Sequence, residues 1–264
     1  MADPLQRWKW TVAYDGATYE GWQSQPSGNT IQDALERALS DIKGMPSRTR
    51  VHGSGRTDAG VHADGQVCHV DTPARLQLDA HSWPRAMNAR LPANIRILDA
   101  EPVSDAFHAR FSAISKTYRY QIFFGNILPP MLAERAWQIH SPLDRNVLLQ
   151  AASILQGTHD FSAFAANRGP NCPPPSSTIR TIKNIEIVEA TDNQWFLLFT
   201  ADGFLYRMVR MLVGTIVKFA NGNISEQELR KLVSAPGLLK TSACAPAKGL
   251  YLQALDYLDE RPPK

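Results

Sequence analysis

Hydrophobic positions follow two different periods in the first hundred residues. From Trp8 to Tyr14, large apolar residues alternate with smaller or polar ones, as in a half-buried strand. Between Ile31 and Ile42 the apolar residues recur at helical spacing, and Thr30 in front of them can cap the helix. Further strands are expected at 48–53, 66–71 and 94–103, and a second helix at 79–91. The predicted order of elements is β-α-β-β-α-β.

The rest of the chain repeats this order. Strands are expected at 116–124, 179–190, 194–201 and 249–258, helices at 144–157 and 203–222, and a loop at 158–161. Ser225 and Glu228 form a capping box for one additional helix. The order β-α-β-β-α-β is typical of ferredoxin-like folds. We therefore predict an α+β protein with two ferredoxin-like halves, 1–105 and 106–264. The halves would form one mixed, largely antiparallel sheet with helices on one face, and would leave a basic cleft between them.

Composition limits the classes of protein that fit this pattern. The 264 residues are 44% hydrophobic and 20% charged, as in globular proteins. The net charge of +3 and the pI near 8.8 permit a polyanionic partner without requiring one. No apolar stretch approaches the roughly 18 residues of a membrane span, and the first residues lack the apolar core of a secretory signal. The three cysteines are far apart, so we expect a cytoplasmic protein without disulfides or a cysteine zinc site.

The stretch GSGRTDAGVHADGQVCHV, residues 53–70, places a glycine-rich loop directly before a predicted strand. The simplest interpretation is a long hairpin in which glycines supply positive φ angles. Three features favour a functional loop. It is longer than a tight hairpin needs, its Arg56 and Asp58 can point into the same cleft, and glycines allow a ligand to approach the backbone closely.

This loop resembles the signature of the tRNA pseudouridine synthase A (TruA) family. Other segments resemble that family in the same order along the chain: YDGATYEGWQSQP, TIQDALERAL, FHARFSAISKTYRYQI, GTHDFSAF, FLYRMVRMLVG and APAKGLYL. Because the matching segments span nearly the whole chain, the resemblance is far more specific than any one motif.

The resemblance implies an activity, a fold and partners. The family isomerises uridine to pseudouridine in the anticodon stem-loop of tRNA, at positions 38–40, by moving ribose C1′ from N1 to C5 of uracil. It needs no cofactor and no metal, because uracil is both the leaving and the incoming group. The implied fold is two ferredoxin-like halves with a cleft. The implied partners are the tRNA anticodon arm and a second copy of the chain in a homodimer.

Three residues match the family's catalytic positions. Asp58 matches the catalytic aspartate, as nucleophile or base; attack on C1′, attack on C6 and removal of a ribose proton all remain open. Without the resemblance, an aspartate that orders its own turn is the better interpretation. Arg210 matches the active-site arginine and would pair with Asp58, although a solvated surface arginine is the ordinary alternative. Tyr118 matches a tyrosine that stacks on the base and could help to move the C5 proton; the alternative is a core aromatic residue.

Further residues are candidates for binding or for a metal. Arg56 is expected to enter the RNA helix or to hold a phosphate while the base flips out. Arg207 is expected to be solvated or to contact a phosphate, and Arg110 is one of several basic residues near predicted loops and strand ends. His52, His62 and His69 lie close in sequence, but their spacing matches no metal-ligand pattern, so no metal is expected.

Two other classes of protein fit parts of the sequence. A non-catalytic RNA-binding or chaperone protein could use the same scaffold, but it would not need the set Asp58, Tyr118 and Arg210. A nucleoside hydrolase would cleave the same glycosidic bond, but such enzymes often use a metal held by carboxylates, and no acidic cluster is present in the sequence.

Overall fold

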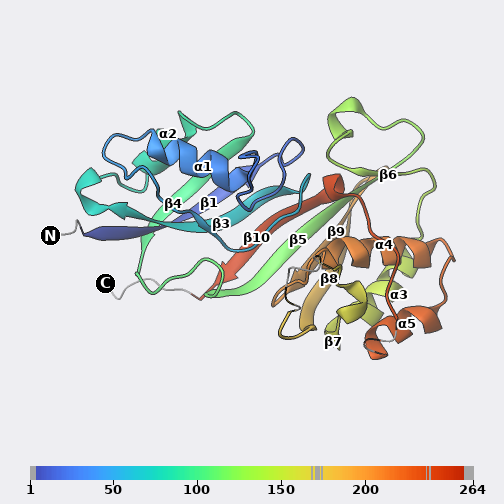
Figure 1. The fold of residues 1–264 in the computed structure, drawn as a ribbon. Coiled ribbons are helices and arrows are strands. Elements are labelled where there is room, and N and C mark those ends of the chain that lie inside the picture. The colour runs from blue at the N-terminus through green and yellow to red at the C-terminus, as the bar shows by residue number, and fades with distance from the viewer. Residues whose placement is uncertain are drawn as a thin grey trace. The chain divides into compact units, whose positions relative to one another are not determined.

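The computed structural model describes residues 4–167, 169, 173, 175–235, 237 and 239–258. These residues form ten strands and five α-helices, so the chain belongs to the α+β class (Figure 1). Contacts divide the chain into a first unit, residues 1–114 with 251–264, and a second unit, residues 115–250. The division into halves at residue 105 stays a prediction. No helix in the described part of the chain is long and apolar enough to cross a membrane.

The part of the sheet that belongs to the first unit has its longest strands at its centre. Its strands are β1 (Leu5–Tyr14), β2 (His52–Gly53), β3 (His62–Pro73), β4 (Ile95–Val103) and β10 (Leu250–Tyr257). They follow the order β4-β1-β3-β10, and β2 also pairs with β3. The β1 pairings with β3 and β4 are antiparallel, whereas β10 runs parallel to β3 and pairs Tyr251 with His62.

Two helices cover one face of this sheet (Figure 1). They are α1 (Ile31–Ser40) and α2 (Ser82–Asn88). The predicted cap of α1 is confirmed, because Thr30 Oγ1 accepts a hydrogen bond of 3.2 Å from Asp33 N. Beneath the helices, the alternating residues of β1 are buried, and the Trp10 and Trp83 rings lie 5.4 Å apart in the core.

The second unit holds the other five strands of the ten-stranded sheet and has its own helices. Its strands are β5 (Ala113–Phe124), β6 (Trp137–Ile139), β7 (Gly157–Asp160), β8 (Ile179–Thr191) and β9 (Gln194–Ala201). The order β5-β9-β8-β7 is antiparallel, and β6 runs parallel to β5. The helices α3 (Arg145–Leu155), α4 (Met208–Ala220) and α5 (Glu226–Ser234) pack against one another, and the predicted capping box of α5 is confirmed.

Two predicted elements of the second unit are wrong in detail. The helix expected from residue 203 begins only at Met208, because Arg207 adopts a left-handed conformation (φ 59°, ψ 11°) that an α-helix cannot contain. Residues 157–160 form a strand rather than a loop, because they pair with residues 179–182 of β8. That pairing links segments far apart in sequence, so the local pattern does not reveal it. In the first unit, the strand expected at 48–53 is reduced to His52–Gly53.

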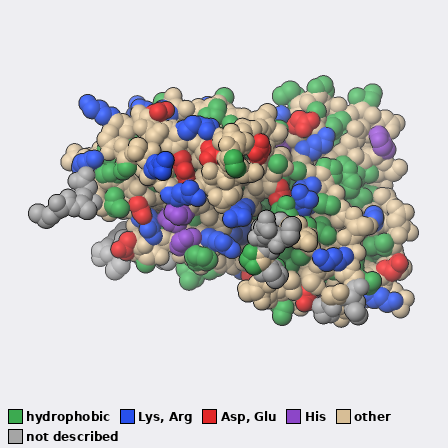
Figure 2. Space-filling model, viewed as in Figure 1, with side chains coloured by type: hydrophobic (Ala, Val, Ile, Leu, Met, Phe, Trp, Pro, Cys, Tyr) green, Lys and Arg blue, Asp and Glu red, His purple; other side chains and the backbone are tan. Residues whose placement is uncertain are grey.

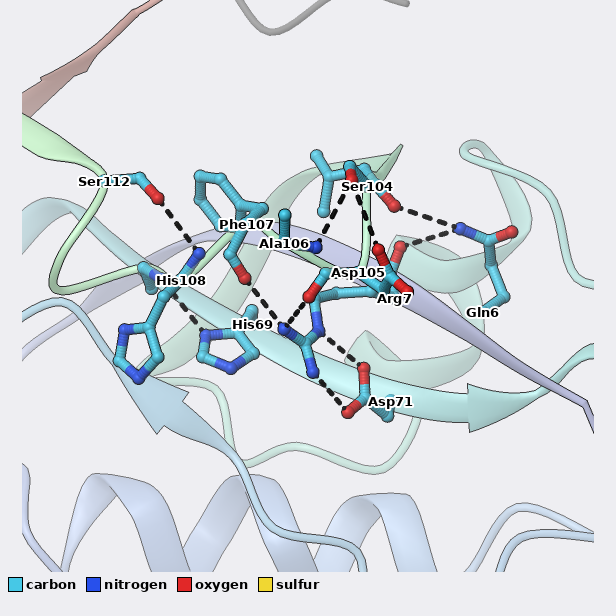
Figure 3. A network of polar contacts seen from close by, with 12 residues as sticks. Gln6, Arg7, His69, Asp71, Ser104, Asp105, Ala106, Phe107, His108 and Ser112 are labelled. Carbon is cyan, nitrogen blue, oxygen red and sulfur yellow. Dashed lines mark hydrogen bonds and ion pairs between the residues drawn. The ribbon is translucent and has the colours of Figure 1, made fainter.

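A polar network ties β1 and β3 to the turn that follows β4 (Figure 3). Arg7 donates to both carboxylate oxygens of Asp71, at 2.7 and 2.8 Å, and to Phe107 O at 2.9 Å. The hydrogen bond from Arg7 holds the pKa of Asp71 below its usual value. His69 Nδ1 accepts a 3.1 Å hydrogen bond from Ala109 N. Burial is the main cause that lowers the pKa of His69 from 6.5 to about 4, and the neighbouring cationic groups add to it.

The shifted pKa of His69 predicts a loss of stability in mild acid. Between pH 6.5 and about 4, the unfolded chain takes up a proton at this histidine and the folded chain does not. The free energy of unfolding should therefore decrease as the pH falls through this interval. His69→Gln keeps an acceptor for Ala109 N but does not titrate, so its stability should depend less on pH. Urea unfolding at a series of pH values measures both slopes, with the exposed His140→Gln as control. Parallel curves for wild type and His69→Gln would contradict the prediction.

Candidate active site

The segment that carries Asp58 lies between β2 and β3 and is fixed by backbone hydrogen bonds. Trp22 N donates to Thr57 O at 3.1 Å, and Gly60 N donates to Tyr19 O at 3.3 Å. A turn closes where Val61 N donates to Asp58 O at 3.1 Å. Asp58 itself is half-buried. A partly accessible carboxylate is thus carried by a backbone that is held on both sides.

The loop after β1 approaches this segment so closely that side chains cannot fit between the two backbones. A Cβ atom added at Gly16 would lie 2.0 Å from Val61 O. At Gly21, which has a φ of 97°, it would lie 2.4 Å from Thr57 O. Both contacts are shorter than any real Cβ atom allows, so the Asp58 segment requires glycine at these two positions.

Buried polar side chains also hold the Asp58 segment through hydrogen bonds. The Tyr14 hydroxyl hydrogen-bonds to Thr57 Oγ1 at 2.8 Å, and burial raises the pKa of Tyr14. Ser54 Oγ donates to Gln66 Oε1, and Gln66 Nε2 donates to Gly55 O at 3.1 Å. Sequence reasoning did not single out these residues for the site. The local sequence pattern gives no signal for them, because their contacts join residues up to 43 positions apart in the chain.

The three histidines considered as metal ligands have separate structural roles. His62 is buried, accepts a 3.1 Å hydrogen bond at Nδ1 from Gly16 N, and stacks on the Tyr251 ring at 4.6 Å. It therefore joins the loop after β1 to the start of β3. His52 and His69 stack on each other at 4.9 Å. The described residues contain no group of three or more histidine, cysteine or acidic side chains that could hold a metal ion.

Tyr118 lies in the middle of β5 and is 9% exposed. Its ring meets the Phe204 ring edge-to-face, with centroids 5.1 Å apart and planes at 90°. Arg119, the next residue, has its guanidinium 4.8 Å from the centre of the Phe196 ring. Tyr118 and Tyr120 share one strand face, as the alternation predicts, and Tyr120 is buried with its hydroxyl on Pro246 O at 2.8 Å. Tyr118 is thus held in place by its neighbours.

Arg210 lies in the first turn of α4, and one segment holds both its backbone and its side chain. Ala245 N donates to Arg210 O at 2.9 Å, and Arg210 Nε donates to Ala245 O at 2.8 Å. The bond at Nε fixes the plane of the guanidinium group, which can present two parallel N–H donors to a carboxylate or phosphate. Arg207, at the start of the same helix, is exposed, and its guanidinium lies 5.1 Å from the centre of the Tyr206 ring.

The candidate residues divide between the two units. Asp58, Arg56 and Arg110 belong to the first unit, and Tyr118, Arg207 and Arg210 belong to the second. Arg56 and Arg110 are exposed. On the face displayed in Figure 2, Lys and Arg side chains lie among Asp and Glu side chains, consistent with the small net charge. What the described residues offer chemically is an ionisable carboxylate on a fixed loop, an oriented guanidinium and a packed aromatic hydroxyl.

Comparison of the whole sequence with known proteins identifies the family to which this chain is similar. A family model described as tRNA pseudouridine synthase matches residues 11–112 and 151–257, ranges that include Asp58 and Arg210 but not Tyr118. A tRNA pseudouridine synthase A from Akkermansia muciniphila is 48% identical over 261 residues, which cover 97% of each chain. Proteins of the same name from Bordetella petrii (41% identity, 94% of this chain and 90% of the other) and Bacillus subtilis (40%, 95% and 99%) are also similar. The match extends over most of the chain in both kinds of comparison, and this chain belongs to the tRNA pseudouridine synthase family.

Proposed function

We propose that the chain is an isomerase that converts uridine to pseudouridine in the anticodon stem-loop of tRNA, at positions 38–40. The observation that carries the proposal is the family match over both ranges of the chain, which includes the GRTDAG loop with Asp58. Relatives at 40–48% identity over nearly the whole chain have the name tRNA pseudouridine synthase A.

The reaction breaks one glycosidic bond and forms another. The bond between ribose C1′ and N1 of uracil breaks, the base turns, and C1′ bonds to C5. The proton displaced from C5 leaves, and N1 gains one, so the atoms balance without a co-reactant. Asp58 acts as the nucleophile or as the proton acceptor while uracil is detached from the ribose. Arg210 pairs with Asp58 and keeps it ionised, and Tyr118 stacks on the target base.

Local structure supports these roles. A carboxylate that must meet a flipped nucleotide needs a fixed backbone, and the Asp58 segment is held by Trp22, Tyr19 and Tyr14. The Arg210 guanidinium is oriented by its bond to Ala245 O. The Tyr118 ring is positioned by Phe204. Arg56, Arg110 and Arg207 are accessible cations, suited to phosphate contacts.

The wider setting is part of the same proposal. The order β4-β1-β3 with β2 on β3 supports a ferredoxin-like first half. A second such half, a basic cleft between the halves, a homodimer and a cytoplasmic location complete the proposal.

Incubation with unmodified tRNA and digestion to nucleosides separates the candidate classes. The isomerase yields pseudouridine, a hydrolase yields free uracil, and a binding protein leaves uridine unchanged.

Asp58→Asn should leave the fold and tRNA binding intact and remove activity. A neutral amide is neither a good nucleophile nor a base, so turnover should fall by more than roughly 10³-fold. Pseudouridine formation, the tRNA dissociation constant and thermal unfolding should be measured together. Asp64→Asn, at an exposed aspartate six residues further on, is the matched control and should stay active. Product formation by Asp58→Asn near the wild-type rate would show that the assignment is wrong.

Arg56→Ala should reduce turnover more than it reduces tRNA affinity. The reason is that Arg56 holds the state in which the base is flipped out, which costs a few kcal/mol. The measurement compares single-turnover rates at saturating tRNA with dissociation constants over a range of salt concentrations. Arg85→Ala, which removes an exposed arginine on α2, controls for net charge. Equal losses of rate and affinity in Arg56→Ala would reduce this residue to an ordinary phosphate contact.

Tyr118→Phe and Tyr118→Leu should separate stacking from proton transfer. Phenylalanine keeps the ring and its edge-to-face contact with Phe204, whereas leucine removes both. If stacking is the whole role, only the leucine variant loses turnover, because base stacking contributes about 1–3 kcal/mol. A phenylalanine variant that binds tRNA but stalls before product would assign the hydroxyl to proton transfer. Full activity of the leucine variant would exclude Tyr118 from the site.

A further inference from the structure

The turn at residues 107–112 carries an exposed aromatic ring on a rigid support. Phe111 is 75% exposed, although Phe107 and Ala109 in the same turn are buried against Val67. Monomeric proteins expose single apolar side chains routinely, so exposure alone carries no conclusion. The surroundings of this ring distinguish it from an incidental surface residue.

The turn is held from several sides, as Figure 3 shows for part of it. Ala109 N donates to His69 Nδ1 at 3.1 Å, and the Tyr257 hydroxyl donates to Ala109 O at 2.7 Å. Ser112 N donates to His108 O at 2.9 Å. Arg7 donates hydrogen bonds to the carbonyl oxygens of Asp105 and Phe107, just before this turn tightens. Phe111 therefore extends from a fixed backbone, so little conformational entropy is lost when it binds a ligand.

Four rings follow one another from the strand surface to Phe111, and we call them the ring column: His52, His69, His108 and Phe111. Successive ring centroids lie 4.9, 4.7 and 4.4 Å apart. Arg110 places its guanidinium 5.4 Å from the centre of the Phe111 ring. Phe111 at the end of the column is accessible, and a cation lies beside it.

The hydrogen bonds within the turn fix the chemistry of the histidines. His108 Nδ1 accepts from Arg110 N at 3.1 Å and from Phe111 N at 3.4 Å, and His69 Nδ1 accepts from Ala109 N. Each neutral ring then carries its proton on Nε2. The free nitrogen of His108 is thus an N–H donor rather than a metal ligand. Burial is the main cause that lowers the pKa of His108, so the neutral donor form dominates at neutral pH.

Asp71, an acidic neighbour of His69, is already paired with a cation. Both oxygens of Asp71 are occupied by Arg7. An exposed ring, an adjacent guanidinium and a neutral N–H donor suit a nucleotide, which offers a flat base and an anionic phosphate. A hydrophobic protein partner would use the ring but not the donor or the cation.

We propose that Phe111 is a stacking platform for an unpaired base of tRNA, with Arg110 and the Nε2–H of His108 directed to the adjoining phosphate. The contact is additional to the binding of the target uridine at Asp58. It rests on the proposed function only in that tRNA is the RNA bound. Phe111 is a binding residue in this proposal and takes no part in the isomerisation.

Variants at Phe111 test the proposal through binding. Phe111→Ala should raise the tRNA dissociation constant about 5- to 150-fold, the equivalent of about 1–3 kcal/mol for one stacked base. Phe111→Trp keeps a flat ring and should bind nearly as wild type. Leu98→Ala, at a 57% exposed apolar residue on β4, is the matched control and should not change affinity. The salt dependence of the tRNA dissociation constant should be unaltered in Phe111→Ala. In Arg110→Ala it should correspond to the release of about one counterion fewer.

Three results would overturn the proposal. They are wild-type affinity in Phe111→Ala, equal losses in Phe111→Ala and Phe111→Trp, and a change of oligomeric state in Phe111→Ala that accounts for its lost affinity. The last result, read by sedimentation velocity, would assign the surface to a second copy of the chain. The tRNA dissociation constant is measured separately from pseudouridine formation, so the two proposals can fail independently. A wild-type protein that binds tRNA but forms no pseudouridine would contradict the proposed function alone, and wild-type affinity in Phe111→Ala with normal product would contradict only this inference.

Discussion

Direct contact between two backbones, without side chains between them, is the constraint on which the candidate site depends. Val61 O and Thr57 O occupy the space that Cβ atoms at Gly16 and Gly21 would need. The loop after β1 can therefore lie against the Asp58 segment and exchange hydrogen bonds with it. The pairing of β1 with β3 shifts register between Val12 and Tyr14, at the end of β1 that leads into this loop. A bulge of this kind redirects the chain at the end of a sheet.

The second unit fixes its candidate residues by a different device. Arg207 takes a left-handed conformation that a non-glycine residue adopts at a cost of roughly 1–2 kcal/mol. This conformation begins α4 abruptly, so that Arg210 lies in its first turn. The two hydrogen bonds between Arg210 and Ala245 then attach that turn to the segment that carries Ala245. Gly214, one turn further along, lets the same segment approach, since a Cβ there would lie 3.0 Å from the Ala243 backbone. Local strain and close packing together orient one guanidinium group.

Much of the fold follows from local signals, and the failures have definite causes. The caps at Thr30 and Ser225 are set by residues three positions apart, so the sequence reveals them directly. The early start expected for α4 is wrong because the apolar spacing of the helix continues back through residues 203–207, whereas the helical backbone begins only at Met208. Strand β7 exists only through its partner β8. For the site, Asp58 stands out through a motif, whereas the buried support from Tyr14, Thr57 and Gln66 depends on distant parts of the chain meeting.

The parallel pairing of β10 with β3 has a consequence for the order in which the protein can mature. The ribosome delivers the Asp58 loop early, but the neighbouring strand, with Tyr251 stacked on His62, follows only after the whole second unit has been made. The first unit is therefore discontinuous in time as well as in sequence. Until Tyr251 and Leu252 have been synthesised, the start of β3 next to this loop lacks the strand that pairs with it there. A nascent chain can therefore fold its second unit while the loop after β1 already holds the Asp58 segment but the adjoining edge of β3 is still open.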